Sequence, residues 1–315
     1  MYITNVFNEN LNSWENNGTY IEYSTFKHKV FVRSIGNEKA TAVSTVLLIH
    51  GFPESSYSYH KVVDGLTKIF DRIVLFDFIG FGLSDKPTEN FSYSILEHAD
   101  TAIEVWKQLN IKGGHLIAHD MGDSVATEIV ARFNQGLLDT LLYEGLQSIT
   151  FTNGSMVLKF ADLRITQKLL LTKFGYLLNK VVNKSIFHHQ IKSAHGNDDL
   201  TKQDVQSLWD LNLLKDGYRK AYLTIRYYLD RIKYEQTKWL PALNETKLPV
   251  HICWGDADAV AKVEIAYHLK EKICPNAELT IMKNVGHFCQ LSNPEVWLES
   301  VEAFYEQLSL STGKL

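Results

Sequence analysis

Short runs of apolar, often β-branched residues recur along the chain, and several end at a glycine or an acidic residue. Five of them have the length of a strand: Ser44–His50, Arg72–Asp77, His115–His119, Leu248–Trp254 and Glu278–Met282. Uninterrupted apolar runs of this length are typical of strands that are buried on both faces of a mostly parallel sheet. The pattern therefore predicts such a sheet at the centre of the fold.

Helical periodicity occupies the intervals between these runs. The predicted helices are Ser55–Ile69, Ser94–Leu109, Gly122–Phe133, Ala261–Lys272 and Pro294–Leu308. Pro294 suits the first turn of the last helix because proline has no N–H to leave unpaired there. The alternation of strand and helix predicts a doubly wound α/β fold.

One long stretch, 153–244, breaks this alternation. It contains only helical periodicities, the clearest being Leu169–Val182, Gln203–Leu214 and Tyr218–Arg231. A helical insertion between strands of a parallel sheet predicts a cap over the carboxyl ends of the strands, where open α/β sheets bind ligands. We therefore expect a core in two parts, 1–152 and 245–315, with a helical cap formed by 153–244.

The composition adds limits to this picture. The chain has 315 residues, of which 45% are hydrophobic, and a formal net charge of −4. This length can bury a sizeable core. Because the charge is nearly balanced and no long run of one sign occurs, we expect neither nucleic acid nor an anionic membrane surface as a partner. Lys180, Lys184 and Lys192 are expected on a solvated helix face.

The sequence carries no evident targeting or metal-binding signal. Met1–Asn10 lacks the positive charge and apolar stretch of a signal peptide. No run approaches the roughly 18 apolar residues that cross a bilayer. Cys253, Cys274 and Cys289 lack metal-ligand spacing and are predicted to be reduced, buried thiols. We expect a cytoplasmic protein of unknown oligomeric state, with no cofactor and no metal ion.

The segment Gly114–Asp123 carries the strongest indication of catalysis. A predicted strand ends at Asp120, a helix follows at once, and small residues, Ala118 and Gly122, flank the turn. This is the arrangement of a nucleophile elbow, which usually has serine at its centre. We predict that Asp120 is the nucleophile. A shifted reading centred on Ser124 is the alternative, but a first-turn helix serine that hydrogen-bonds locally accounts better for that residue.

Two partners follow in the chain order of an α/β-hydrolase triad, which is nucleophile, acid and histidine. The loop after Trp254 offers two acids, Asp256 and Asp258, and Asp258 is preferred because it lies deeper in the loop. Of the twelve histidines, only His287 lies in a glycine-bounded loop after the last predicted strand. We predict that Asp258 orients His287, with Asp256 as the alternative acid.

Several strings resemble the epoxide hydrolase and haloalkane dehalogenase branch of the α/β-hydrolase fold. They are His50–Pro53, Asp77–Pro87, Ala118–Gly122, Trp254–Asp258 and Gly286–Phe288, and they span the whole core. Asp123, together with the His-Gly-Phe-Pro and Ser-Asp-Lys-Pro strings, is also similar to the mesoderm-specific transcript family. The resemblance implies an oxyanion hole formed by the backbone N–H groups of Phe52 and Met121, and a cis peptide bond before Pro53.

An aspartate nucleophile restricts the chemistry. Its reference pKa is about 4, so it is ionised at neutral pH without a base. Attack on a saturated carbon gives an alkyl ester of the enzyme, which a water activated by His287 then hydrolyses, while Asp258 stabilises the imidazolium. The expected substrate is a small apolar molecule with an electrophilic carbon: an epoxide, an alkyl halide or a strained lactone.

The leaving group separates these substrates. Haloalkane dehalogenases resemble this chain but place side-chain N–H donors where it has Phe52 and Met121, which leaves the cap residues Trp209 and Trp239 as possible donors. Epoxide hydrolases use cap tyrosines as acids, and the cap here is rich in tyrosine. Tyr228 takes the place of the epoxide hydrolase acid, although Arg226 and Leu229 depart from the family string.

From these residues we predict an epoxide hydrolase-like enzyme. Tyr228 is its predicted acid, Tyr176 is a weaker candidate for a second donor, and both Tyr176 and Trp209 are expected to contact the substrate. A haloalkane dehalogenase or a β-lactone-processing enzyme is the alternative. A non-catalytic binding protein is a remote alternative, because a fold does not determine function.

Overall fold

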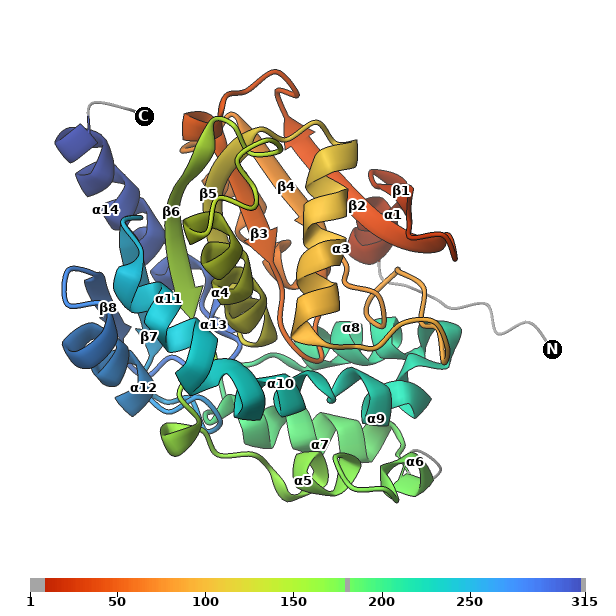
Figure 1. Cartoon of the computed structure of the whole chain (residues 1–315). Helices are drawn as coiled ribbons and strands as arrows, with labels where there is room; N and C mark the ends of the chain where they lie inside the picture. Colours follow the sequence, from red (N-terminus) through yellow and green to blue (C-terminus); the bar gives the residue numbers. More distant parts are fainter. Residues whose placement is uncertain (1–8, 179–181, 313–315) are drawn as a thin grey trace.

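A computed structural model describes residues 9–178 and 182–312. Residues 1–8 of Met1–Asn10 and residues 179–181 of the predicted helix Leu169–Val182, including Lys180, lie outside these residues. An eight-stranded sheet with the order β1-β2-β4-β3-β5-β6-β7-β8 forms the centre of the molecule (Figure 1). Strands β1 and β2 are antiparallel to their neighbours, and every pair from β4 to β8 is parallel. This confirms the predicted mostly parallel α/β fold.

The five predicted strands are all present. They are β3 (Thr45–Ile49), β4 (Arg72–Phe76), β5 (Gly113–His119), β7 (Val250–Gly255) and β8 (Glu278–Met282). Every residue of β3, β4, β5 and β7 is buried, which explains their continuous apolar character.

Three further strands escaped prediction. They are β1 (Thr19–Tyr23), β2 (His28–Gly36) and β6 (Gly145–Thr152). Strand β1 lies at the sheet edge and is largely exposed, and Thr19 and Glu22 interrupt its apolar pattern. Strand β6 is central, but Gln147, Ser148 and Thr150 interrupt its apolar pattern. Neither strand therefore carries the continuous run by which the others were found.

Helices cover both faces of the sheet. On one face, α3 (Ile95–Gln108), α4 (Met121–Asn134) and α11 (Leu240–Glu245) pack together. On the other, α1 (Glu9–Asn16), a 3₁₀ turn (Ser56–Tyr59), α2 (Val63–Leu66) and α14 (Pro294–Thr312) enclose a second apolar cluster. The predicted helix Ser55–Ile69 is therefore two short pieces, and Ala261–Lys272 is α12 (Glu264–His268) with a π turn, Leu269–Ile273.

The cap consists of helices between β6 and β7. They are α5 (Ile165–Leu170), α6 (Gly175–Leu178), α7 (Lys184–His195), α8 (Lys202–Leu213), α9 (Ala221–Thr224) and α10 (Tyr227–Tyr234). In the described part of 153–244 the only β pairing is one isolated bridge, Ala161 to Ala261. These helices gather below the sheet in Figure 1, with α5 and α6 outermost. No helix within residues 9–178 and 182–312 is long and apolar enough to cross a membrane.

Candidate active site

Asp120 occupies a sharp turn between β5 and α4. Its backbone has a φ of 48° and a ψ of −109°, a left-handed conformation that is unusual for any residue except glycine. Two residues later, a Cβ on Gly122 would lie 2.5 Å from the carbonyl oxygen of Ile49 and 2.7 Å from that of His50. Glycine is therefore required at 122, as the elbow interpretation demands.

Ser124 lies inside α4, in its first turn, and does not occupy the turn of the elbow. Its hydroxyl accepts a hydrogen bond of 2.8 Å from Nε of Arg231, a residue of the cap. This geometry supports Asp120 rather than Ser124 as the residue displayed by the strand–helix turn.

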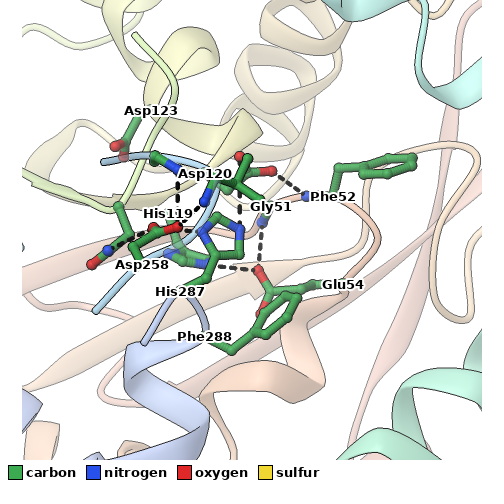
Figure 2. A network of polar contacts seen from close by, with 12 residues as sticks. Gly51, Phe52, Glu54, His119, Asp120, Asp123, Asp258, His287 and Phe288 are labelled. Carbon is green, nitrogen blue, oxygen red and sulfur yellow. Dashed lines mark hydrogen bonds and ion pairs between the residues drawn. The ribbon is translucent and has the colours of Figure 1, made fainter. Parts of the chain in front are cut away.

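The Asp120 carboxylate is buried, and its two oxygens have different neighbours. Oδ2 accepts a hydrogen bond of 2.9 Å from the backbone N–H of Phe52, whereas Oδ1 lies 4.0 Å from Nε2 of His287 (Figure 2). The Phe52–Pro53 peptide bond is cis, as expected. Met121 is the first residue of α4, so its N–H has no acceptor within the helix and is available at the same turn. The pair Phe52 and Met121 thus suits an oxyanion at Oδ2.

Asp258 contacts the far side of the His287 ring. Its Oδ2 lies 2.7 Å from Nδ1 of His287. The backbone N–H groups of Val260 and Ala261 donate to Oδ1 at 2.7 Å and 2.9 Å, which holds the carboxylate in place. Asp256 points elsewhere, since it pairs with Lys283 at 3.1 Å and accepts from the N–H of Asn284.

The carboxylates around His287 change its basicity. Burial alone lowers the pKa of His287, but the nearby Asp258 and Asp120 outweigh it and raise the pKa to about 9. Below that pH the resting site therefore holds an imidazolium between Asp120 and Asp258.

Sequence reasoning missed Asn153, which follows β6. The side-chain Nδ2 of Asn153 donates to Oδ2 of Asp258 at 2.8 Å, and the side-chain Oδ1 of Asn153 accepts from the N–H of Gly255 at 2.9 Å. Asn153 therefore connects the ends of β6 and β7 and orients the acid beside His287. A polar residue at the end of a recognised strand would have been a candidate, but β6 itself was not recognised.

A further buried carboxyl, Glu54, was also missed. Its Oε2 lies 3.2 Å from Nε2 of His119, and its Oε1 accepts from the side-chain amide of Gln290 at 3.1 Å (Figure 2). Burial raises the pKa of Glu54 to about 8, although the positive charge of His287 opposes this. His119 places Nδ1 3.0 Å from the carbonyl oxygen of Thr152, so Nδ1 carries the proton and Nε2 faces a protonated Glu54.

Asp123 is a fourth buried acid of this site, one turn along α4 from Asp120. Its Oδ1 accepts from the N–H of Thr152 at 3.3 Å. Burial raises the pKa of Asp123 well above its ordinary range, and the adjacent Asp120 raises it further. The raised pKa values of Glu54 and Asp123 favour the protonated form of both carboxyl groups near neutral pH.

Asp120 and His287 open into a cavity of about 280 Å³ beneath the cap. Most of its lining is apolar and comes from α5, α7 and the segments beside them: Leu163, Leu170, Leu178, Val182, Ile186, Phe187 and Ile191. Such a cavity suits a small apolar ligand.

Tyr227 and Arg231 are polar side chains of α10 that line this cavity. Both are about 2% exposed, and the Arg231 guanidinium carbon lies 4.9 Å from the centre of the Tyr227 ring. Nη2 of Arg231 donates to the backbone carbonyl of Asp120 at 3.0 Å and lies 4.0 Å from its Oδ1. The cap therefore brings a phenol and a guanidinium close to Asp120. Arg231 had not been considered in the sequence, and Tyr227 was only one of several cap tyrosines.

The cap residues chosen from the sequence lie outside the lining of this cavity. Tyr228 is half-buried and packs against the main core cluster. Tyr176 is 52% exposed on the outer surface, and Trp209 is buried in a separate cluster with Phe187. The indole N–H of Trp239 donates to Glu128 at 2.8 Å, so it is not available to a ligand. Within the described residues, no group of three or more His, Cys, Asp or Glu side chains is arranged to hold a metal ion.

Comparison with known proteins now identifies the class that this fold and site define. The family model of the alpha/beta hydrolase fold matches residues 44–294, so the chain belongs to this family. The match confirms the resemblance inferred from the sequence strings and supports a hydrolase.

Two curated relatives span nearly the whole chain. A putative hydrolase LipZ of Mycobacterium tuberculosis is 34% identical over 291 residues, which cover 91% of this chain and 95% of that protein. The mesoderm-specific transcript homolog protein of Bos taurus is 28% identical over 302 residues, which cover 93% and 87%. The second likeness agrees with the family to which Asp123 and its neighbouring strings pointed.

Solved structures share the fold at low identity. A haloalkane dehalogenase DbeA loop variant from Bradyrhizobium elkanii superposes with a TM-score of 0.74 at 17% identity, over 94% of this chain and 99% of that one. The Cif epoxide hydrolase from Acinetobacter nosocomialis gives 0.73 at 18% identity, over 94% of both chains. At this identity the likeness establishes the fold alone.

Proposed function

We propose that this chain is a hydrolase that forms a covalent alkyl ester on Asp120, and that its substrates are apolar epoxides. The observation that carries the proposal is the Asp120 carboxylate itself. One oxygen is held by the N–H of Phe52, and the other faces both His287 and an apolar cavity. An ionised carboxylate in that position suits displacement at a saturated carbon, because attack on an acyl group would give a reactive anhydride.

In the first step, Oδ1 of Asp120 attacks an epoxide carbon. The C–O bond of the ring breaks, and the oxygen that leaves takes a proton from a cap donor. Oδ2 becomes the carbonyl oxygen of the new ester and stays beside the N–H of Phe52. No base is needed for this step, since a carboxylate is ionised at neutral pH.

In the second step, His287 removes a proton from a water that attacks the carbonyl carbon of the ester. The gap of 4.0 Å between Nε2 and Oδ1 marks where that water would approach. Negative charge develops on Oδ2, where the N–H groups of Phe52 and Met121 stabilise it. The ester C–O bond then breaks, and the diol leaves with the proton from His287. The second proton of the water, which is left on the Asp120 carboxyl group, returns to the cap donor, so the Asp120 carboxylate and the donor are both restored.

The electrostatics couple these two steps. In the resting site the Asp120 charge contributes to the raised pKa of His287. Formation of the ester removes that charge, so the pKa of His287 falls and the neutral imidazole needed as a base becomes more populated. Asp258 retains its charge and stabilises the imidazolium that forms during water attack.

Tyr227 supports an epoxide as the substrate. Its phenol lines the cavity on α10, and burial, reinforced by the charge of Asp120, raises the pKa of Tyr227. It therefore stays protonated and can donate to the oxygen of an opening ring. Tyr228 lies next to it in sequence but outside the cavity lining, so we assign the donor role to Tyr227.

A haloalkane is the second candidate substrate, and Arg231 is the observation in its favour. A departing halide is an anion, and the Arg231 guanidinium approaches Oδ1 of Asp120 to 4.0 Å. Against this, two of its N–H groups already bind Ser124 and the Asp120 carbonyl. Among the described residues that line the cavity, none is a tryptophan.

Trapping the ester tests the proposal and separates the two substrates. We expect the His287→Gln variant to form the alkyl ester but not to hydrolyse it, so intact mass spectrometry should show an adduct at Asp120. With styrene oxide the protein should gain the mass of the whole epoxide. With 1-bromohexane, a dehalogenase would gain only the hexyl group and release bromide.

The matched control is the double variant Asp120→Asn with His287→Gln, which should remain unmodified. If the wild type converts either probe while His287→Gln accumulates no adduct, a covalent mechanism is wrong. If neither probe is converted or bound covalently, the proposal fails in favour of a different chemistry or a binding role.

A further inference from the structure

The cap contains a long segment with positive charge and no acidic residue. Between Asp162 and Asp198 there are 35 residues without Asp or Glu, in a chain that has 36 acids among 315 residues. The same segment has six basic residues: Arg164, Lys168, Lys173, Lys180, Lys184 and Lys192. The net charge of −4 for the whole chain conceals this asymmetry, which is why the sequence suggested no affinity for anionic surfaces.

This segment also exposes large apolar side chains. Five of the fifteen exposed large hydrophobic residues in the described part of the chain lie on or beside α5 and α6: Ile165, Leu169, Phe174, Tyr176 and Leu177. Their exposed fractions run from 41% to 76%. We call these five residues, together with the exposed Lys168 and Lys173, the outer cap face. An apolar patch of this kind on a monomer usually marks an interaction site.

The outer cap face lies at the edge of the molecule farthest from the sheet. Figure 1 shows α5 and α6 beyond α7, on the opposite side of the cap from the strands. The inner sides of the same helices line the cavity through Leu170 of α5 and Leu178 of α6. The helices α5 and α6 are therefore apolar on two sides, one toward the cavity and one toward the exterior.

The positive charge of the outer cap face indicates which kind of partner it can bind. If two copies of the chain met symmetrically through this face, Lys168 and Lys173 would approach their own copies, which is unfavourable. The negatively charged surface of a lipid bilayer complements both features, because lysines attract anionic headgroups while aliphatic and aromatic side chains enter the boundary of the acyl region.

We propose that the outer cap face docks on the surface of an anionic lipid bilayer. Phe174, Leu169 and Leu177 enter the interface, and Lys168 and Lys173 contact the headgroups. A docked enzyme would meet apolar substrates at the membrane, where they concentrate. The proposal rests on the exposed surface and does not depend on the chemistry proposed for Asp120.

Vesicle flotation with the full chain tests the proposal. We expect binding to vesicles of phosphatidylcholine mixed with phosphatidylserine, much weaker binding to phosphatidylcholine alone, and release by salt. The double variant Lys168→Gln/Lys173→Gln should bind at least about tenfold more weakly, since each lysine near an anionic surface contributes appreciably. Leu169→Ser/Phe174→Ser should also lose binding through lost insertion.

Matched controls lie elsewhere on the surface. Lys39→Gln/Lys68→Gln removes the same charge, and Leu137→Ser/Leu310→Ser removes the same kind of exposed apolar group. Circular dichroism should show that all four double variants are folded. If the control variants lose as much vesicle binding as the variants in the outer cap face, the proposal that binding occurs through this face is wrong.

Two further outcomes would also overturn the proposal. One is the absence of wild-type binding to either kind of vesicle at low salt. The other is a wild-type dimer, seen by size-exclusion chromatography with light scattering, that Leu169→Ser/Phe174→Ser converts to a monomer without any vesicle binding. That result would assign the face to a second copy of the chain. Because the assay measures binding, its outcome is independent of whether Asp120 forms an ester.

Discussion

The core and the cap contribute to the candidate site in different ways. The core supplies Asp120, His287 and Asp258 from turns at the ends of buried strands, and backbone N–H groups hold both carboxylates. The cap supplies Tyr227 and Arg231 from α10, a helix of eight residues that follows several short helical pieces. Main-chain N–H groups of the core thus fix the two carboxylates, whereas Arg231 of the cap is fixed by bonds that its own long side chain makes to Ser124 and to the Asp120 carbonyl.

This difference suggests a division of roles. Groups that form and hydrolyse an ester need positions accurate to a fraction of an ångström, which turns at the ends of strands provide. Groups that recognise a leaving group vary with the substrate, and a helical cap can exchange them without disturbing the sheet. We therefore expect changes in the core to abolish turnover of every substrate, and changes in the cap to act on one class of substrate.

The largest effect is expected for Asp120→Ala. Removal of the Asp120 carboxylate should lower kcat/KM by at least about 10⁴-fold for every substrate, because Asp120 is the only carboxylate among the described residues that line the cavity. Ser124→Ala is the matched control and should retain most activity. Steady-state kinetics of both variants test this prediction. If Ser124→Ala loses activity and Asp120→Ala retains it, the assignment of Asp120 to the elbow is wrong.

A smaller loss, about 10³- to 10⁴-fold in ester hydrolysis, is expected for Asp258→Ala. Asp258 lies 2.7 Å from His287, whereas Asp256 pairs with Lys283. Asp256→Ala should therefore change the rate little. Single-turnover measurements should place the loss for Asp258→Ala in the second step. Equal losses in the two variants would contradict the assignment of the acid.

In the cap, Tyr227→Phe should slow epoxide opening by about 10²-fold, the lower range for general acid catalysis. The same change should affect the conversion of a bromoalkane little, since a halide leaves without a proton. Tyr228→Phe serves as the control because its ring packs outside the cavity lining. If Tyr228→Phe alone slows epoxide opening, the original interpretation from the sequence is restored.

The smallest expected effect is that of Glu54→Gln on the pH dependence of folding stability. The folded pKa of Glu54, about 8, lies above its ordinary value of 4.5, so the folded state holds a proton that the unfolded chain releases. Wild-type stability should therefore decline as the pH rises from about 4.5 to about 8. His287 adds a decline between about 6.5 and 9, because its folded pKa is also raised.

Glutamine at position 54 cannot ionise, so the variant should show a weaker decline than the wild type. Thermal unfolding at pH 5 and pH 9 measures this directly. If the difference in Tm between pH 5 and pH 9 is the same in Glu54→Gln as in the wild type, the pKa of Glu54 is not raised in the folded protein.

Much of the fold was readable from the sequence, with errors that have a common cause. The fully buried strands and α3, α4 and α14 were predicted close to their bounds because burial on both faces, or along one stripe, imposes a regular pattern. Strands β1 and β6 were missed because the first is exposed at an edge and the second carries polar residues. With β6 unrecognised, Asn153 could not be seen as a strand-end residue beside Asp258.

The sequence by itself determined the mostly parallel sheet, the strand–Asp120–helix turn and the order of Asp120, Asp258 and His287. These depend on local periodicity and on small residues required within a few positions of a turn, both of which are visible in a single chain. Only the tertiary structure decided that Asp258 rather than Asp256 contacts His287, that Tyr227 and Arg231 rather than Tyr228 line the cavity, and that Glu54 lies beside His119. Those contacts join residues far apart along the chain, and a rotation of α10 by one residue changes which tyrosine faces the nucleophile. The packing of the cap on the core sets that rotation, and no local pattern encodes it.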